Sequence, residues 1–289
     1  MYASPAWAGL FIFCLALAAG SPAALALGDA KHGAYLAKAA GCIGCHTAAR
    51  KGAVPFAGGR ALKTPFGTFY GPNITPHPDA GIGRWDGDDF ARALRAGTGP
   101  GGAHFFPAFP YPSFTKITDA DARDLWAYVS SLPPDATPSR GHELVFPAGW
   151  RFLAAAWQWL FFKPGVFVPD PARSAAENRG RYLVDALGHC GECHTPRNLF
   201  GATDTGRYLA GAKLAEGSGA PNLTPTRLKK WSDAELADFL SSGMTPDGDV
   251  VGDTMGEVIR NTTSQWTPED LAAVVAYLRR VPARPEAPR

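Results

Sequence analysis

The sequence has 289 residues, of which 46% are apolar and 19% are charged, with a formal net charge of +2. This length suits one large domain or two ordinary ones, and the apolar share is sufficient for a packed core. The small net charge gives no indication of a nucleic-acid partner. The 33 glycines and 26 prolines predict long loops between few helices.

Residues 1–26 are predicted to be an export signal. The apolar stretch from Leu10 to Ala19 is followed by small residues and by an Ala-Leu-Ala pattern at positions 24–26, which is typical of a cleavage site. Because no Lys or Arg precedes the stretch, an uncleaved anchor is the alternative, although a membrane span needs about 20 apolar residues. We expect cleavage and a mature chain in the periplasm, without Cys14.

The segment 27–134 is predicted to be the first domain. A short helix should precede Cys42, a second helix should follow the N-cap Asp86, and a closing helix should run from Thr118 to Leu132. The closing helix begins with the spacing of a capping box, with Asp in place of Glu. Its apolar residues recur at i, i+3, i+4 and i+7, so one face should pack on the helix before the cysteine motif.

Residues 135–177 are rich in proline and aromatic residues and are predicted to be a linker strap packed across both domains. The alternative is a surface that docks on a partner subunit or on the inner membrane, which would associate the protein peripherally with that membrane. The apolar centre of this segment, about fifteen residues interrupted by Arg151 and Lys163, is too short to cross a bilayer.

The segment 178–289 is predicted to be a second domain that repeats the first. Its middle helix should follow the N-cap Ser232, and its closing helix should run from Thr267 to Val281 with the same apolar spacing. The repeated motifs are Gly-x-Tyr-Leu at 33–36 and 180–183, Pro-Asn-x-Thr-Pro at 72–76 and 221–225, and a Trp twelve residues before a Gly, at Trp85 and Trp231.

Each domain contains one Cys-x-x-Cys-His motif. Two thiols about one helical turn apart can add to the two vinyl groups of one haem, and the next residue can bind the iron. A zinc site, a thiol–disulfide pair or structural disulfides are the alternatives, but none of them needs a His directly after each cysteine pair. We therefore predict two covalently bound haem c groups, held by Cys42, Cys45 and His46 and by Cys190, Cys193 and His194.

The order of helices around each motif predicts the fold class. A helix before the motif, a middle helix and a closing helix, with loops between them, are typical of a small class I cytochrome c domain. We predict an all-α, loop-rich fold of two such domains in tandem, wrapped around their haems.

The second axial ligand is expected to differ between the haems. Met255 lies 24 residues after Trp231, and the same step from Trp85 reaches Phe109, which cannot bind iron. Met255 is therefore the predicted ligand of haem 2, and Met244 is expected to be a packing residue. His104 is the predicted ligand of haem 1, with a five-coordinate iron as the alternative. His32, His77 and His142 are weaker candidates.

Several segments resemble the cytochrome c subunits of bacterial membrane-associated dehydrogenases, of the quinohaemoprotein alcohol dehydrogenase and gluconate dehydrogenase types, and related cytochromes that serve molybdenum hydroxylases. The resemblance covers nearly all of residues 29–283. The alcohol and gluconate dehydrogenase subunits carry three haems and have Met where this chain has Phe109. The segments are Phe-Pro-Ala-Phe-Pro-Tyr at 106–111, Phe-Pro at 146–147, Asn-Arg-Gly at 178–180 and Gly-His-Cys-Gly-Glu-Cys-His-Thr-Pro-Arg-Asn at 188–198.

The resemblance implies an electron-transfer subunit without a substrate of its own. It would take electrons from a catalytic dehydrogenase subunit and pass them toward the respiratory chain, through a quinone-linked acceptor or a terminal oxidase. A haem enzyme, either a peroxidase or a sulfur-compound dehydrogenase reacting at haem 1, is the alternative that Phe109 favours. A bare soluble shuttle is less consistent with the size of the chain and its aromatic strap.

Overall fold

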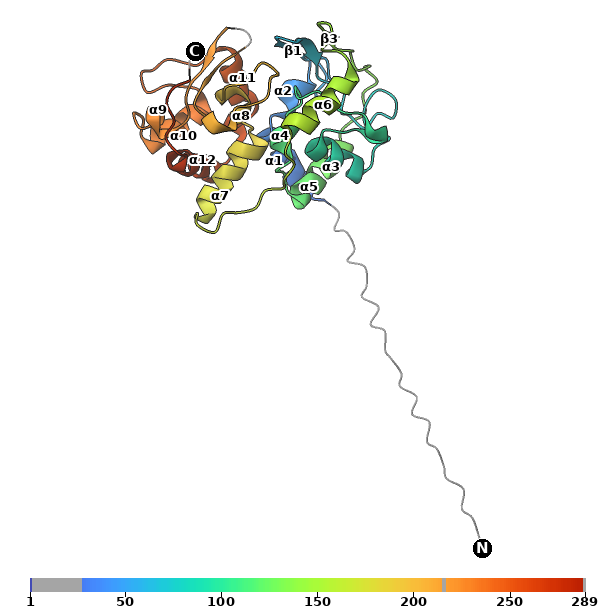
Figure 1. The fold of residues 1–289 in the computed structure, drawn as a ribbon, viewed down its shortest axis with the longest axis horizontal. Coiled ribbons are helices and arrows are strands. Elements are labelled where there is room, and N and C mark those ends of the chain that lie inside the picture. Colours follow the sequence, from blue (N-terminus) through green and yellow to red (C-terminus); the bar gives the residue numbers. More distant parts are fainter. Residues whose placement is uncertain (2–27, 215–216, 288–289) are drawn as a thin grey trace.

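The computed structural model describes Met1, residues 28–214 and residues 217–287. The predicted export signal lies outside these residues, apart from Met1. Two similar halves lie side by side, with α1 to α6 in one and α7 to α12 in the other (Figure 1). No helix in the described part of the chain is both long and apolar enough to cross a membrane.

The first half and the linker are helical and rich in loops. The three strands form one antiparallel sheet in the order β1-β2-β3, so the linker contributes the edge strand β3. The elements are α1 (Ala30–Ala39), α2 (Cys42–His46), β1 (Ala61–Thr64), β2 (Gly67–Tyr70), α3 (Gly87–Ala96), η1 (Pro100–Gly102), α4 (Tyr111–Phe114), α5 (Asp119–Ser130), β3 (Glu143–Leu144) and α6 (Arg151–Phe161).

The second half repeats this order with small changes. The strands β4 and β5 form a short antiparallel pair, and η2 is a π-helical turn that continues α7. The elements are α7 (Ala175–Tyr182), η2 (Leu183–Leu187), α8 (Gly191–His194), η3 (Thr205–Arg207), β4 (Ala212–Lys213), β5 (Gly219–Ala220), α9 (Pro225–Leu228), α10 (Asp233–Ser242), α11 (Asp253–Asn261), η4 (Thr263–Gln265) and α12 (Pro268–Arg280).

The predicted helix starts are confirmed by their caps. The side chains of Asp86, Thr118, Ser232 and Thr267 each accept a hydrogen bond from the backbone N–H three residues later. These bonds satisfy donors that the first turn of a helix leaves unpaired. The short strands were not predicted, because runs of two to four residues carry too little alternation to be recognised.

The closing helix of each half packs on the helix before its own cysteine motif, α5 on α1 and α12 on α7. The glycine of each Gly-x-Tyr-Leu motif allows the two backbones to approach closely. A Cβ on Gly33 would lie 1.9 Å from the carbonyl oxygen of Asp124, and a Cβ on Gly180 would lie 1.9 Å from that of Ala273. The packing therefore explains why this motif occurs in both halves.

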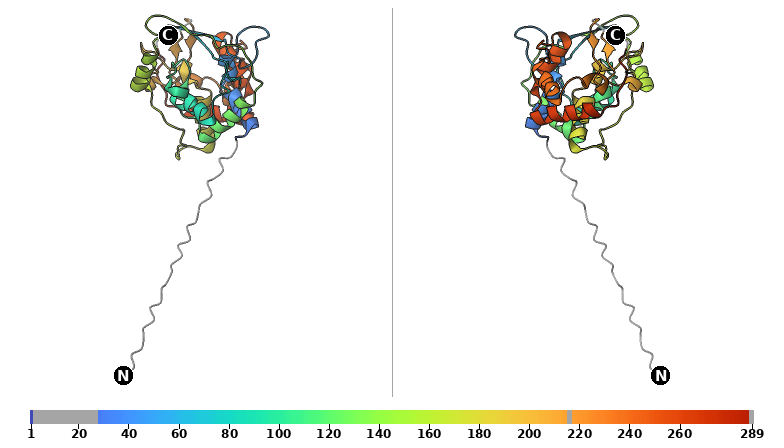
Figure 2. Two further views of the ribbon diagram at one scale, coloured as in Figure 1. Left: turned by 90° about the vertical axis from the view of Figure 1, so that its right-hand side faces the viewer. Right: turned by 90° about the vertical axis from the view of Figure 1, so that its left-hand side faces the viewer.

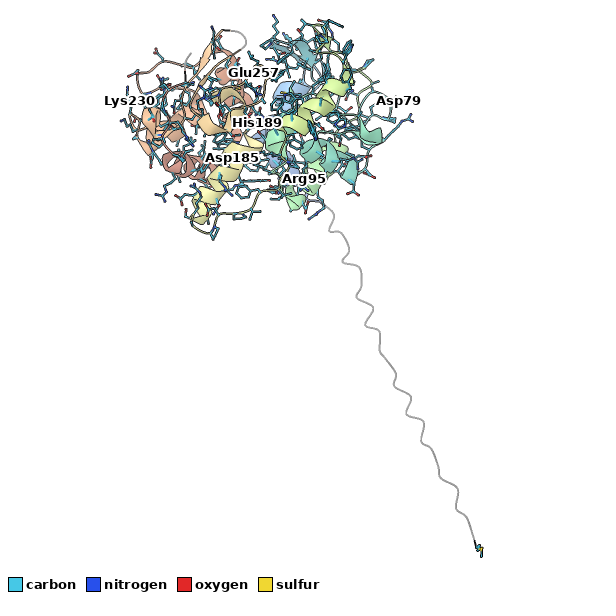
Figure 3. The ribbon with its side chains drawn as sticks, in the orientation of Figure 1. Asp79, Arg95, Asp185, His189, Lys230 and Glu257 are labelled. Carbon is cyan, nitrogen blue, oxygen red and sulfur yellow. The ribbon has the colours of Figure 1, made fainter. Side chains whose placement is uncertain are left out.

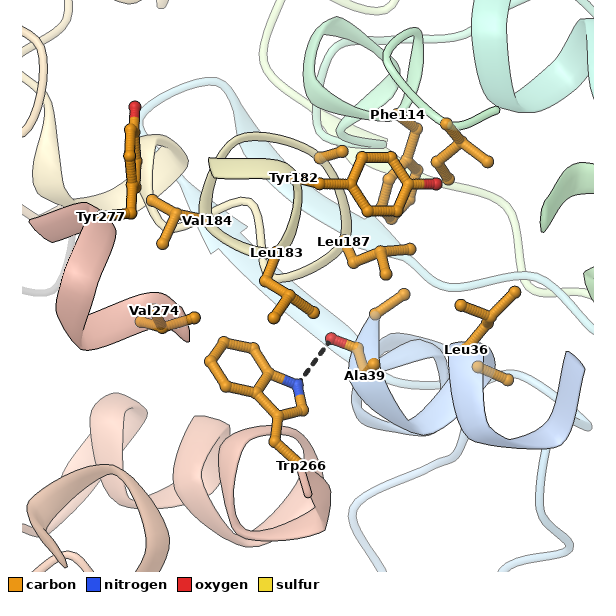
Figure 4. Close-up of a cluster of buried hydrophobic side chains, with 14 of the residues drawn as sticks. Leu36, Ala39, Phe114, Tyr182, Leu183, Val184, Leu187, Trp266, Val274 and Tyr277 are labelled. Carbon is orange, nitrogen blue, oxygen red and sulfur yellow. Dashed lines mark hydrogen bonds between the residues drawn. The ribbon is translucent and has the colours of Figure 1, made fainter. Parts of the chain in front are cut away.

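The tyrosine of the same motif joins the two halves. The Tyr182 hydroxyl donates to Asp121 Oδ2 (2.5 Å) at the start of α5. In the reciprocal contact, the Tyr35 hydroxyl donates to Asp270 at the start of α12. The halves thus meet through matching contacts, and the buried side chains of both form one continuous core (Figure 4).

Replacing Asp270 by Ala should destabilise the protein more than replacing its counterpart Asp121. Asp270 accepts two hydrogen bonds from Arg179, both 2.7 Å long, as well as the bond from Tyr35. Removing the carboxylate leaves a partly buried cation without its partner, so we expect a loss of about 3 kcal/mol, against about 1 kcal/mol for Asp121→Ala. Urea unfolding of the haem-loaded variants measures both. Equal losses would show that the ion pair contributes nothing beyond the tyrosine bond.

Candidate haem sites

The helix α2 contains the whole first cysteine motif, and α8 with the preceding Cys190 contains the second. A residue with left-handed backbone stands before each motif, Gly41 with φ 63° and His189 with φ 37°. This conformation turns the chain sharply between the long helix and the short one that bears the cysteines. The two motifs are therefore each preceded by a turn of the same kind.

The histidine of each motif is oriented by a proline carbonyl in the Pro-Asn-x-Thr-Pro loop. His46 Nδ1 donates to the carbonyl oxygen of Pro72 (2.8 Å), and His194 Nδ1 donates to that of Pro221 (2.7 Å). Burial lowers the pKa of both imidazoles. The rings are therefore neutral, with the proton on Nδ1 and the lone pair of Nε2 available to an iron.

The asparagine of that loop holds the proline carbonyl in place. The Asn73 amide donates to the backbone oxygens of Asp135 and Thr137, both at 2.9 Å, and the Asn222 amide donates to that of Arg284 (3.0 Å). Both asparagines are buried. The sequence showed that the Pro-Asn-x-Thr-Pro loop is repeated, but it did not show the role of this loop. Its asparagine positions the proline carbonyl that orients the histidine.

Two further pairs of residues at these sites were missed. Thr47 and Thr195, directly after each motif, accept through Oγ1 from the backbone N–H of Phe56 and of Leu209, both at 3.0 Å. Phe56 and Leu209 have positive φ values of 64° and 60°, which is costly for residues other than glycine. The threonine that follows both motifs could have indicated this hydrogen bond from the sequence. The positive φ values of Phe56 and Leu209 could not be predicted, because the two residue types have nothing in common that favours that conformation.

The cysteines do not have the environment of a redox or zinc site. Burial raises the pKa of Cys42 to about 12 and that of Cys190 to about 12, whereas a reactive thiol pair needs a lowered pKa. Within residues 28–214 and 217–287, no cysteine belongs to a group of three or more His, Cys, Asp or Glu side chains close enough to share a metal ion. The donor set of two thiols and one Nε2 on a short helix instead fits haem c.

Comparison with known proteins agrees with this geometry. The family model for cytochrome c matches residues 30–133 and 178–282. The chain belongs to the cytochrome c family. Covalent haem c, whose iron supplies a reversible one-electron couple when bound, is the cofactor of this family.

Three relatives refine the comparison. The cytochrome is 45% identical to the diheme cytochrome c-type of Cereibacter sphaeroides, over 89% of this chain and 87% of that protein. It is 38% identical to the cytochrome c subunit of the quinone alcohol dehydrogenase of Gluconobacter oxydans, over 89% of this chain. It is 36% identical to the gluconate 2-dehydrogenase cytochrome c subunit of Pantoea cypripedii, over 93% of this chain. The predicted likeness to such subunits is confirmed, but the alignments span only 55% and 65% of these two.

Met255 and Phe109 correspond in the sequence repeat, but Met255 lies in α11 whereas Phe109 lies in a turn before α4. Both middle helices end at a left-handed glycine, Gly97 and Gly243. The isolated bridge between Thr98 and His104 is matched by one between Met244 and Val250, so the two halves keep the register of the repeat as far as His104 and Val250. Met255 lies half-buried in the first turn of α11. The expectation that Met244 is a packing residue is wrong, because 48% of it is exposed.

His104 is held by the linker helix. Its Nδ1 lies 2.6 Å from Gln158 Oε1, its backbone oxygen accepts from Arg151, and Gln158 donates in turn to the carbonyl of Gly97. Phe109 packs against the rings of Phe105 and Phe114. Ligation by His104 and by Met255 therefore stays a prediction.

The weaker ligand candidates have other polar partners. His32 pairs with Asp124, His77 accepts from the backbone N–H groups of Asp79 and Ala80, and His142 accepts from the backbone N–H of Tyr70.

The carboxylate of Asp185 in η2 should make stability depend on pH. It accepts from the hydroxyls of Tyr208 (2.5 Å) and Tyr277 (3.2 Å). Burial raises the pKa of Asp185, and the Tyr208 bond only partly opposes it. A raised folded-state pKa favours the protonated form, so this contribution to stability is present at low pH and is lost as pH rises through the folded-state pKa.

Asp185→Asn should abolish that dependence. Each unit by which the folded-state pKa exceeds the unfolded one corresponds to about 1.4 kcal/mol of unfolding free energy. Urea unfolding of wild type and variant between pH 4 and pH 8 measures the difference. We expect the wild type to lose stability relative to the variant as pH rises; parallel curves would contradict the assignment.

Proposed function

We propose that this protein is a periplasmic dihaem cytochrome c that transfers electrons from a catalytic dehydrogenase subunit toward the respiratory chain. His46 and His194 would bind the two irons, and the cysteines of each motif would hold the porphyrins. Met255 would complete haem 2 and His104 would complete haem 1. The acceptor would be quinone-linked or a terminal oxidase.

The contact between the two haem-attachment segments is the observation that carries this proposal. Trp266 Nε1 donates to the carbonyl oxygen of Ala39, three residues before Cys42 (Figure 4). The ring of Trp266 also packs on Gly188, two residues before Cys190, since a Cβ on that glycine would lie 3.0 Å from it. Figure 3 shows His189 between the two halves. Two haems attached on either side of one interface suit electron passage through the protein.

Reduction of the haems in a native complex tests the dehydrogenase role. The cytochrome is purified from its own membranes with any subunit that accompanies it, and haem absorbance is followed as candidate dehydrogenase substrates are added. We expect reduction of both haems by the substrate of a co-purifying catalytic subunit. A chain that purifies alone, and is reduced by no substrate in the membrane fraction, would contradict the proposal.

Phe109 favours the alternative of a haem enzyme, because it cannot bind iron. This alternative is tested by asking whether the iron of haem 1 has a second axial ligand. If His104 binds iron, low-temperature EPR of the oxidised protein shows two low-spin haems, and His104→Ala converts one of them to high spin. His77→Ala, which changes a histidine outside that loop, is the matched control. A high-spin haem in the wild type would refute ligation by His104. Turnover of hydrogen peroxide by that protein would then establish the peroxidase alternative.

A further inference from the structure

The linker helix α6 and the residues just before it expose several large apolar side chains. The row begins with Phe146 before the helix, and its first three rings lie next to one another, with centroids 5.1 Å apart for Phe146 and Trp150 and 5.5 Å apart for Trp150 and Phe152. We call this row the aromatic face: Phe146, Trp150, Phe152, Trp159 and Leu160, which are 81%, 49%, 62%, 84% and 60% exposed.

The opposite side of α6 is firmly packed, so the aromatic face is not left over from a loosely folded helix. Ala154 and Gln158 are buried. The ring of Trp157 meets Tyr111 edge-on, and its indole N–H donates to the backbone oxygen of Phe200 (2.8 Å) in the other half. The helix therefore lies across both halves, as a strap would, and presents its other face outward. Both views of Figure 2 show α6 at the outer edge of the molecule.

The charges within the chain segment that bears this face are of one sign. Residues 144–169 contain no Asp or Glu. The two charged residues of this stretch are Arg151 in the first turn of α6 and Lys163 just after its end. Aromatic residues on one face with cations at the ends are typical of helices that lie in the interface of an anionic bilayer.

The chemistry of the face favours lipid over protein. Specific protein interfaces form about one hydrogen bond per 100–200 Å², but the only hydrogen-bonding side-chain groups of the aromatic face are the indole N–H groups of Trp150 and Trp159. A membrane surface needs no such partners, and tryptophan is enriched at the level of the headgroups. Since α6 has only 11 residues, it can lie along a bilayer but cannot cross it.

We propose that the aromatic face binds the surface of an anionic phospholipid bilayer, with α6 parallel to the membrane plane. The cytochrome would then stay at the inner-membrane surface by this face. The inference is independent of the electron-transfer role, because none of its residues belongs to a Cys-x-x-Cys-His motif or is a predicted iron ligand.

Co-sedimentation with vesicles tests this proposal. The mature, haem-loaded protein is mixed with vesicles of phosphatidylglycerol and phosphatidylethanolamine (3:7) or of phosphatidylcholine alone, and haem absorbance in the pellet is measured. We expect binding to the anionic vesicles. A triple variant with Phe152→Ser, Trp159→Ser and Leu160→Ser should lose at least tenfold in partitioning, and Lys163→Gln should lose severalfold on anionic vesicles only.

The controls separate this face from other causes. Val54→Ser changes an exposed apolar residue of the first half outside the linker and should bind as the wild type does. Wild type and variants are all compared as the mature form, so differences in the N-terminal segment cannot imitate the effect. Unchanged haem spectra show that the variants fold. Failure of the wild type to bind, or undiminished binding by the triple variant, would overturn the proposal. If the triple variant instead lost a co-purifying subunit while the wild type ignored vesicles, the face would be a protein interface.

Discussion

A chain with both Cys190→Ala and Cys193→Ala should mature with one haem in place of two. Each pair of thiols can attach only its own porphyrin, because the motifs lie on separate helices, α2 and α8, each with its own histidine and proline carbonyl. The haem-to-protein ratio and the intact mass of protein from a host that makes cytochromes c measure this. The matched variant with Cys42→Ala and Cys45→Ala should lose the other haem, and the quadruple variant should be colourless.

The two single-haem variants also separate the potentials of the haems. Each variant should show one reduction potential, and the two values should match the two potentials of the wild type. A small shift is expected, because each variant lacks the charge of the other haem. Because both halves share one core, in which Leu36, Leu183 and Trp266 are buried, loss of either haem should also lower the stability of the whole chain. Two haems remaining in either cysteine variant would refute the attachment sites.

Replacing Met255 by His should lower the potential of haem 2 while leaving it low-spin. A thioether ligand favours the ferrous state and a second imidazole does not. We expect a fall on the order of 0.1–0.3 V, part of the roughly 0.8 V range over which axial ligands move haem potentials. Potentiometric titration of the variant that retains only haem 2 gives the change without overlap from haem 1.

Met244→His is the matched control for that experiment. Met244 is the other methionine of the same segment, and the structure leaves it 48% exposed in an isolated bridge with Val250. Its replacement should not move the potential of haem 2. A fall with Met244→His and none with Met255→His would exchange the two assignments and would break the equivalence of Met255 with Phe109.

Much of the architecture followed from short-range patterns. The capping residues Asp86, Thr118, Ser232 and Thr267 each act on a backbone group three residues away, so their positions could be predicted. The strand β3 could not, because its pairing joins segments that are distant in the chain, such as Gly67 with Leu144. Short elements depend on the neighbours that they meet in space rather than on their own composition.

The haem-binding chemistry shows the same division. The motifs by themselves predict which residues attach a haem, because one helical turn brings together the thiols and imidazole of five consecutive residues. Only the tertiary structure decided what orients them: the Pro72 carbonyl stands 26 residues after His46, and the Pro221 carbonyl 27 residues after His194. It also decided that Tyr35 reaches Asp270 across 235 residues, and that one face of α6 is buried while the other faces solvent. Such contacts depend on the path of the whole chain, which no local window of sequence contains.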